Sequence, residues 1–183
     1  HKMEQNSKTN RTYLLAGIFG VTGCIAFDQF TKSLAVIYLK NKPPLSLISG
    51  VFELSYLENR GAAFGILQGQ KLFLVLITAV MLSLLVYIYL RIPRERYYRL
   101  IRLTLTLLIS GAIGNLIDRC RQDFVIDFFY FSLIDFPVFN VADIYVTAAA
   151  VLLIFLFLFY YKEEDIDLLL RLCSFRRKKD QNR

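Results

Sequence analysis

Long apolar runs alternate with shorter polar connections along most of this chain. The runs cover residues 12–39, 72–90, 100–117 and 141–161. A helix rises about 1.5 Å per residue and a bilayer core is about 30 Å thick, so runs of this length are typical of membrane-spanning helices. Within lipid, only a helix satisfies all of its backbone groups inside one segment. The pattern therefore predicts an all-α integral membrane protein with four transmembrane helices, forming a single domain over residues 1–183.

The connection between the first two runs departs from this helical pattern. Phe52, Leu54 and Tyr56 alternate with Glu53 and Ser55, and such an alternation is typical of a strand. We therefore expect a small β element between the first two helices, lying on one face of the membrane.

The basic residues are distributed unevenly between the two sides of the predicted bundle. The N-terminal segment, the connection 91–102 and the segment after Tyr161 together hold fifteen Lys and Arg residues, whereas the connections 40–71 and 118–140 hold six. Because basic connections stay in the cytoplasm, we expect both termini on the cytoplasmic side and the β element outside. The tail, residues 162–183, is expected to be an amphipathic segment whose basic end favours anionic lipid.

Composition narrows the possible functions. The chain is 56% hydrophobic with a positive mean hydropathy, as several membrane spans require. The net charge is +7, but the basic residues lie at the ends of the spans. They do not form the stripe of basic and aromatic residues that is typical of a nucleic-acid-binding protein. His1 and Lys2 precede Met3 and are interpreted as a cloning remnant. They include the only histidine, which excludes a histidine triad or metal site, and the three scattered cysteines are interpreted as structural.

Polar side chains are concentrated in the segment 111–143, between two apolar runs. Carboxylates at a membrane boundary cost free energy unless they are paired, hydrated or functional. Asp28 and Lys32 lie one helical turn apart near the outer end of the first span, and Asn59 lies in the first outer connection. All of these side chains are expected to collect at the outer membrane surface, together with Asn115, Asp118, Asp123, Asp127, Asp135, Asn140 and Asp143.

A group of carboxylates at this level has a definite chemical use. Like charges in a medium of low dielectric repel, so one pKa rises and two carboxylates can share a proton. The ionised member activates a water while the protonated member polarises a carbonyl, which hydrolyses an amide without histidine, cysteine or metal. Some members also have structural interpretations. Asp28 and Lys32 could be a charge pair that fixes helix packing, and Asp118 beside Arg119 a polar anchor at a helix end.

Five short motifs, taken in order, resemble the lipoprotein signal peptidases, also called signal peptidase II. These are four-span aspartic peptidases of the bacterial cytoplasmic membrane. Each motif is short, but five in this order over nearly the whole chain are specific. They are DQFTK at 28–32, ENRGAAFG at 58–65, GNLIDR at 114–119, VIDF at 125–128 and FNVAD at 139–143.

The resemblance implies a catalytic dyad of Asp127 and Asp143, with no cofactor and no metal. It implies that the aspartate of GNLIDR, Asp118, supports the site and does not cleave. The chain departs from the family at Asp123, where glycine is usual, and this extra charge could raise the pKa values of the dyad. The residues expected to bind substrate or support the site are Asp28, Lys32, Asn59, Gly61, Asn115, Asp118, Arg119 and Asn140.

The implied substrate is a prolipoprotein whose lipobox cysteine already carries diacylglycerol, cut just before that cysteine. The implied enzyme works at the outer leaflet of the bacterial inner membrane, among membrane lipids, as a monomer that binds no nucleic acid. Two alternatives remain. Residues 21–24, VTGC, resemble a lipobox, which would make this chain a substrate, and the acidic residues could form the relay of a small transporter.

Overall fold

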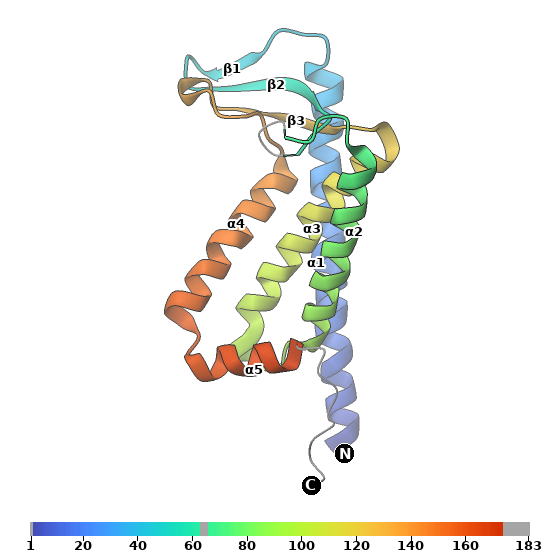
Figure 1. The fold of residues 1–183 in the computed structure, drawn as a ribbon, viewed down its shortest axis with the longest axis vertical. Helices are drawn as coiled ribbons and strands as arrows, with labels where there is room; N and C mark the ends of the chain where they lie inside the picture. The colour runs from blue at the N-terminus through green and yellow to red at the C-terminus, as the bar shows by residue number, and fades with distance from the viewer. Residues whose placement is uncertain (1, 63–65, 174–183) are drawn as a thin grey trace.

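Four long helices form the body of the protein, and a small sheet covers one end (Figure 1). The structure is a computed structural model and describes residues 2–62 and 66–173, with side chains from residue 12 onward. In the described residues, four helices are long and apolar enough to cross a membrane, which confirms the predicted fold class. The helices are α1 (Lys2–Leu39), α2 (Lys71–Arg91), α3 (Arg99–Gln122), α4 (Val141–Phe155), which continues as a π-helical turn (Leu156–Tyr160), and α5 (Glu163–Cys173).

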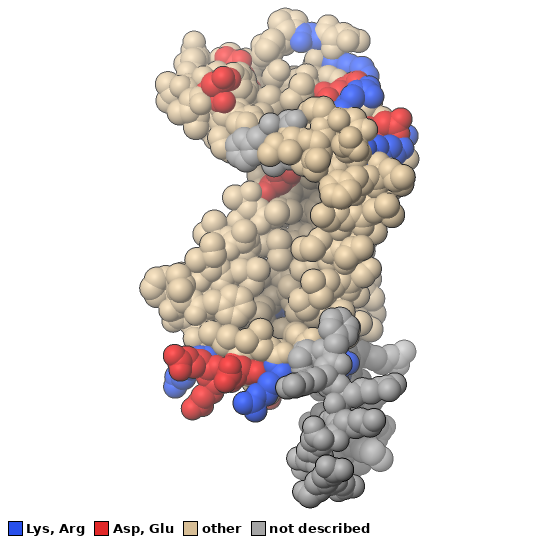
Figure 2. Space-filling model, in the orientation of Figure 1, with Lys and Arg blue, Asp and Glu red and all other residues tan. Residues whose placement is uncertain are grey.

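Charged side chains gather at the two ends of the molecule and leave a wide uncharged band between them (Figure 2). The band coincides with the long helices, and its side chains are exposed and apolar, as on Phe19, Val80 and Phe159. Large apolar side chains are stable in this position only when lipid replaces water around them. The band therefore marks the part of the bundle that lies in the membrane.

Helix α3 is the centre of the bundle and packs against α1, α2 and α4. Two glycines allow the close approach. A Cβ atom on Gly111 would lie 2.5 Å from the carbonyl oxygen of Ala142, and one on Gly114 would lie 2.5 Å from a carboxylate oxygen of Asp28. A side chain at Gly111 would therefore meet the backbone of α4, and one at Gly114 would displace the buried carboxylate of Asp28. The absence of a side chain at these two positions therefore sets the distances of α4 and α1 from α3.

The third span is longer than predicted, because α3 continues to Gln122 and does not end at residue 117. The prediction ended the span at about residue 117, with Asp118 as a polar group at its end. Asp118 is instead only 3% exposed and pairs with Lys32 of α1, so its charge does not interrupt the helix. The helix ends at Asp123, which has a left-handed backbone with φ of 68°.

The predicted β element is one part of a larger sheet. Strands β1 (Leu45–Ile48), β2 (Phe52–Asn59) and β3 (Val125–Tyr130) are antiparallel in the order β1-β2-β3. The prediction placed the β element between the first two helices alone and missed β3, which comes from the connection between α3 and α4. The sheet therefore joins the connection between α1 and α2 and the connection between α3 and α4 into one unit over the end of the bundle.

Helix α5 crosses the opposite end of the bundle (Figure 1). Its Leu169 is buried in a cluster with residues of α3, including Ile101 and Leu105. The carboxylate of Asp165 accepts a hydrogen bond of 2.8 Å from the hydroxyl of Tyr97. This helix forms the first half of the predicted amphipathic tail, and the basic cluster after it lies outside the described residues.

Candidate active site

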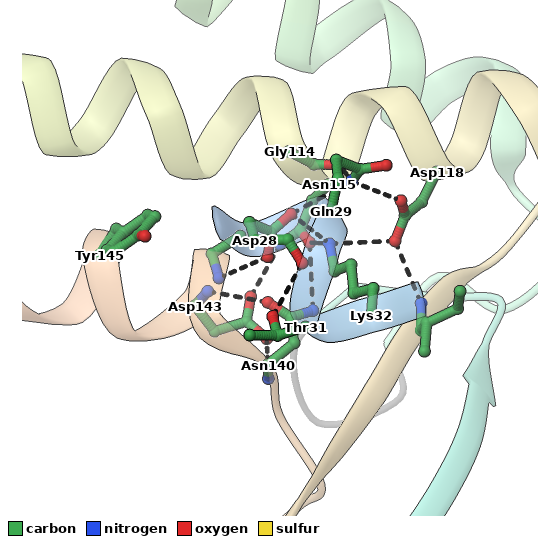
Figure 3. A network of polar contacts seen from close by, with 12 residues as sticks. Asp28, Gln29, Thr31, Lys32, Gly114, Asn115, Asp118, Asn140, Asp143 and Tyr145 are labelled. Atoms are coloured by element: carbon green, nitrogen blue, oxygen red, sulfur yellow. Dashed lines mark hydrogen bonds and ion pairs between the residues drawn. The ribbon is translucent and has the colours of Figure 1, made fainter. Parts of the chain in front are cut away.

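The polar residues of the separate motifs meet where the sheet covers the bundle (Figure 3). Asp28 and Lys32 come from α1, Asn115 and Asp118 from α3, and Asp143 from the first turn of α4. Most of these side chains are buried, and Asp28, Asp127 and Asn140 are exposed by 1% or less. The expectation that they gather at one level of the bundle therefore agrees with their positions in the structure.

Lys32 is the centre of this network and is 1% exposed. Its Nζ atom lies 2.9 Å from Asp28, 3.0 Å from Asp118 and 2.9 Å from the Oδ1 atom of Asn115. An ammonium group has three donors, so these contacts satisfy all of them. A buried charge with full pairing of this kind is stable, whereas removal of one partner leaves an uncompensated charge in the interior.

Asp28 also fixes the start of α4. Its second carboxylate oxygen accepts a hydrogen bond of 3.0 Å from the backbone N–H of Ala142. That N–H belongs to the first turn of α4, where backbone donors have no partner within the helix. Asp28 thus holds the first turn of α4 against α1, and the hydroxyl of Tyr145 adds a second link at 3.3 Å to the carbonyl of Cys24.

Asp118 links α3 to the sheet, as Asp28 links α1 to α4. Its Oδ2 atom accepts a hydrogen bond of 3.2 Å from the backbone N–H of Ile126, which is the neighbour of Asp127 in β3. The side-chain amide of Gln29 donates to the Oδ1 atom of Asp118 at 2.9 Å. Gln29 was not among the predicted site residues, although it lies between Asp28 and Lys32 in sequence. Its position inside a motif was the only signal that could have indicated it.

The strand β3 presents Asp127 to the site and its neighbours to the core. Side chains alternate along a strand, so Ile126 and Phe128 point the other way and are buried with Ala35 and Leu39 of α1. The backbone of Phe139 pairs with Phe129 of the same strand. This pairing brings the residue after Phe139, Asn140, next to Asp127.

Each carboxylate oxygen of Asp127 accepts one amide hydrogen bond. Asn59 donates to Oδ2 at 2.9 Å, and Asn140 donates to Oδ1 at 2.6 Å. The pKa of Asp127 is raised from 3.8 to about 7, first by burial and then by the charge of Asp143, while the two amide hydrogen bonds and the charge of Lys32 lower it. Asp127 therefore exchanges a proton near neutral pH, unlike an exposed aspartate.

Asp143 lies in the capping box of α4. The side chain of Asn140 accepts a hydrogen bond of 3.0 Å from the backbone N–H of Asp143, and a carboxylate oxygen of Asp143 accepts one of 3.1 Å from the backbone N–H of Asn140. Asn115 donates to the other carboxylate oxygen at 2.8 Å. The side-chain amide of Asn140 also donates to Asp127, so Asn140 contacts both carboxylates, that of Asp127 through its side chain and that of Asp143 through its backbone N–H.

Asn59, Gly61 and Arg119 form a short chain beside the two carboxylates. The Oδ1 atom of Asn59 accepts from the backbone N–H of Gly61 at 2.9 Å, and Arg119 donates to the carbonyl of Gly61 at 2.9 Å. A Cβ atom on Gly61 would lie 2.6 Å from the carbonyl oxygen of Ile66. The chain orients the Asn59 amide, so that its N–H points to Asp127.

Two of the predicted polar residues lie apart from this site. Asp135 accepts a hydrogen bond of 2.7 Å from the hydroxyl of Tyr130. Asp123 is 61% exposed and forms an ion pair with Lys71, which lowers the pKa of Asp123. The charge of Asp123 is thus balanced by Lys71, whereas the pKa of Asp127 is raised by burial and by the charge of Asp143. The expectation that Asp123 raises the pKa values of the dyad finds no support in this arrangement.

Comparisons with known proteins agree with the geometry. The family described as signal peptidase (SPase) II matches residues 21–159. A lipoprotein signal peptidase of Caldanaerobacter subterraneus is 45% identical over 130 residues, covering 70% of this chain and 86% of the relative. One of Clostridium tetani is 44% identical over 133 residues, covering 71% of this chain and 84% of the relative.

The fold is also similar to solved structures of a bacterial membrane enzyme. One, at 2.3 Å resolution, has a TM-score of 0.71 and 32% sequence identity, and covers 81% of this chain and 92% of that structure. A second, at 1.9 Å resolution, has a TM-score of 0.68 and 31% identity. Neither the sequence relatives nor the solved structures support the alternative that this protein is a transporter. The motifs, the fold and the relatives agree, and the chain belongs to the signal peptidase II family of membrane aspartic peptidases.

Proposed function

We propose that this chain removes the signal peptide from prolipoproteins that carry diacylglycerol on the lipobox cysteine. The observation that carries the proposal is the placement of two carboxylates on one residue, Asn140, whose side-chain amide donates to Asp127 and whose backbone N–H donates to Asp143. An aspartic peptidase needs two carboxyl groups that share one proton. A pKa of about 7 for Asp127 supports such sharing at neutral pH.

In the proposed reaction, the ionised member of the dyad takes a proton from a water molecule, whose oxygen attacks the scissile carbonyl carbon. The protonated member donates to the carbonyl oxygen. Collapse of the tetrahedral intermediate breaks the C–N bond, and the dyad gives a proton to the leaving amine of the lipidated cysteine. The products are a signal peptide with a new carboxylate and a lipoprotein with a free N-terminal amine.

The remaining polar residues are proposed to position the dyad and the substrate. Asn59 and Asn140 orient Asp127 through their amides, and Asn115 orients Asp143. Asp28, Lys32 and Asp118 hold the helices and the sheet on which the dyad lies. Arg119 uses one donor on Gly61, and its other donors can meet a backbone carbonyl of the substrate or a lipid phosphate.

The proposed orientation places both termini in the cytoplasm and the sheet at the outer leaflet of the bacterial inner membrane. It follows from the unequal numbers of basic residues in the two sets of connections. In this orientation the acyl chains of the substrate stay in lipid while the scissile amide reaches the dyad. The protein is proposed to act as a monomer, because every group in the proposed dyad network belongs to this chain.

The continuity of α1 argues against the alternative that this chain is itself a lipoprotein substrate. The helix runs unbroken from Lys2 to Leu39, through the residues 21–24 that resemble a lipobox. Cleavage before Cys24 would separate the first part of the helix from Asp28 and Lys32. Mass spectrometry of the intact N-terminus distinguishes the two cases, because an enzyme keeps this segment and a processed substrate loses it.

The test is cleavage of a diacylglyceryl-modified prolipoprotein by purified protein in detergent. We expect Asp127→Asn and Asp143→Asn to abolish cleavage while the proteins remain folded, and a chelator to leave the wild type active. Asp118→Asn is the matched control, because it removes a buried aspartate of the same network outside the dyad, and it should keep measurable cleavage. Normal cleavage by either dyad variant would show that the mechanism is wrong.

A further inference from the structure

A cavity of about 270 Å³ opens between α1 and α3 at the sheet end of the bundle. It is separate from the dyad, because neither Asp127 nor Asp143 lines it. The residues at its opening and walls are Gln29, Ser33, Val36, Ile37, Arg121 and Gln122. A water molecule fills about 30 Å³ of liquid, so the cavity has room for a small polar group of several heavy atoms.

Arg121 supplies an unused positive charge at the opening of this cavity. It is exposed, and within the described part of the chain its guanidinium group has no ion pair or hydrogen bond. The nearest acidic residues in sequence are already engaged, since Asp118 pairs with Lys32 and Asp123 with Lys71. A free guanidinium is a forked donor that matches the geometry of a phosphate.

The floor of the cavity accepts hydrogen bonds and does not attract a second anion. The buried residues of its lining are Lys32, Asp118 and the apolar Ile126, and the three donors of Lys32 are all in use. The Oδ1 atom of Asp118 accepts one hydrogen bond, from Gln29, and a carboxylate oxygen has room for a second. A ligand that fits both parts carries a phosphate at the opening and hydroxyl donors further in.

The surroundings of the cavity are those of a lipid headgroup. Its walls include Val36 and Ile37, and Ile37 is 62% exposed. Phe30 lies seven residues earlier, on the same face of α1, and is 58% exposed. Exposed apolar side chains therefore extend along α1 from the cavity into its membrane-spanning part, where they would contact acyl chains.

We propose that this cavity binds the headgroup of an anionic phospholipid, with the phosphate on Arg121 and headgroup hydroxyls toward Asp118. Phosphatidylglycerol is the simplest lipid with this chemistry. The site is independent of the proposed peptidase dyad, and its test does not require activity. The bound lipid would link α1 to α3 and stabilise the packing on which the buried network depends.

The test is lipid retention by the purified protein, measured by native mass spectrometry in detergent with added phosphatidylglycerol or phosphatidylcholine. We expect phosphatidylglycerol to be retained preferentially, and Arg121→Gln to weaken its binding on the order of tenfold, because a charge-assisted contact is lost. Lys42→Gln is the matched control. It removes one positive charge from an exposed residue at the same end of the molecule, outside the cavity.

A second variant tests the cavity without changing charge. Val36→Trp fills it with an apolar side chain on a lipid-facing helix and should also reduce retention of phosphatidylglycerol. Equal loss in Arg121→Gln and Lys42→Gln would overturn the proposal, as would equal retention of the two lipids by the wild type. A rise in thermal stability with sodium phosphate alone, equal to that with the lipid, would show a general anion site and would also overturn it.

Discussion

Replacing Asn59 by leucine should move the pH dependence of cleavage in a direction that the structure fixes. The amide of Asn59 donates a hydrogen bond of 2.9 Å to Asp127, and this bond lowers the pKa of the carboxyl. Leucine has a similar size and no donor. The ionised form of Asp127 loses a partner, so the pKa of Asp127 rises.

The size of the change follows from the strength of the lost bond. A hydrogen bond to a charged group contributes about 1.5 to 3 kcal/mol, and a pKa change of one unit corresponds to about 1.4 kcal/mol. Asn59 is only half-buried, so water replaces part of the interaction, and we expect a rise of about one pH unit. Asp127 has a pKa of about 7 in the wild type. The alkaline limit, which is the pH above which cleavage declines, should therefore move toward pH 8 in the variant.

The assay is kcat/KM for cleavage of a lipidated prolipoprotein between pH 5 and pH 9. A dyad that holds one proton loses activity as the pH rises through the higher of its two pKa values. The maximal rate of Asn59→Leu is expected to fall as well, because Asn59 also holds Gly61. The position of the alkaline limit, and not the rate, therefore carries the test.

Tyr56→Phe is the control, because the hydroxyl of Tyr56 donates to Glu58 on the same strand and not to the dyad. Its alkaline limit should coincide with that of the wild type. An alkaline limit that stays in place in Asn59→Leu, or that moves to lower pH, would refute the proposed role of the Asn59 hydrogen bond.

Three other substitutions test the packing and charges around the site. Gly111→Ala should lower the free energy of unfolding by about 1 to 3 kcal/mol and reduce cleavage, because the added Cβ atom meets the backbone of α4. Gly23→Ala is the control and should be neutral, since a Cβ atom there has nothing within 4 Å. Equal melting temperatures of the two variants would contradict this prediction. Lys32→Met should lower the free energy of unfolding by about 3 to 5 kcal/mol, because it leaves buried carboxylates unpaired. The double variant Lys32→Met with Asp28→Asn should recover part of this stability, as measured by thermal denaturation. Asp123→Gly should leave the alkaline limit unchanged, because the charge of Asp123 is balanced by Lys71, and a shift in the pH profile would show coupling to the dyad.

The helices were predictable because lipid imposes a simple requirement on sequence. A run of apolar residues must form a helix in a bilayer, and the predicted runs 12–39 and 72–90 lie within one residue of the helical spans Thr12–Leu39 and Lys71–Arg91. The level of the polar residues was predictable for the same reason, since it depends only on their distance from the ends of the runs. Both inferences use local sequence alone.

Features that depend on a distant partner were not predictable in this way. The end of α3 was placed too early because the partner of Asp118, Lys32, is 86 positions away in sequence and belongs to another helix. Strand β3 was missed because VIDFFY is apolar at every position except Asp127, so it has no alternation that would distinguish its two faces. Its pairing with β2 becomes visible only in the sheet.

The pairing of Asp28 with Lys32 within one helix has a consequence for how this protein is made. During synthesis, α1 emerges before α3, so its buried charges enter the bilayer before Asp118 is available. The two groups are one turn apart at 2.9 Å, and a carboxylate and an ammonium on the same helix face can neutralise each other without a second helix. Helix α1 therefore carries its own counter-ion through insertion, and Asp118 joins a pair that is already assembled when α3 arrives.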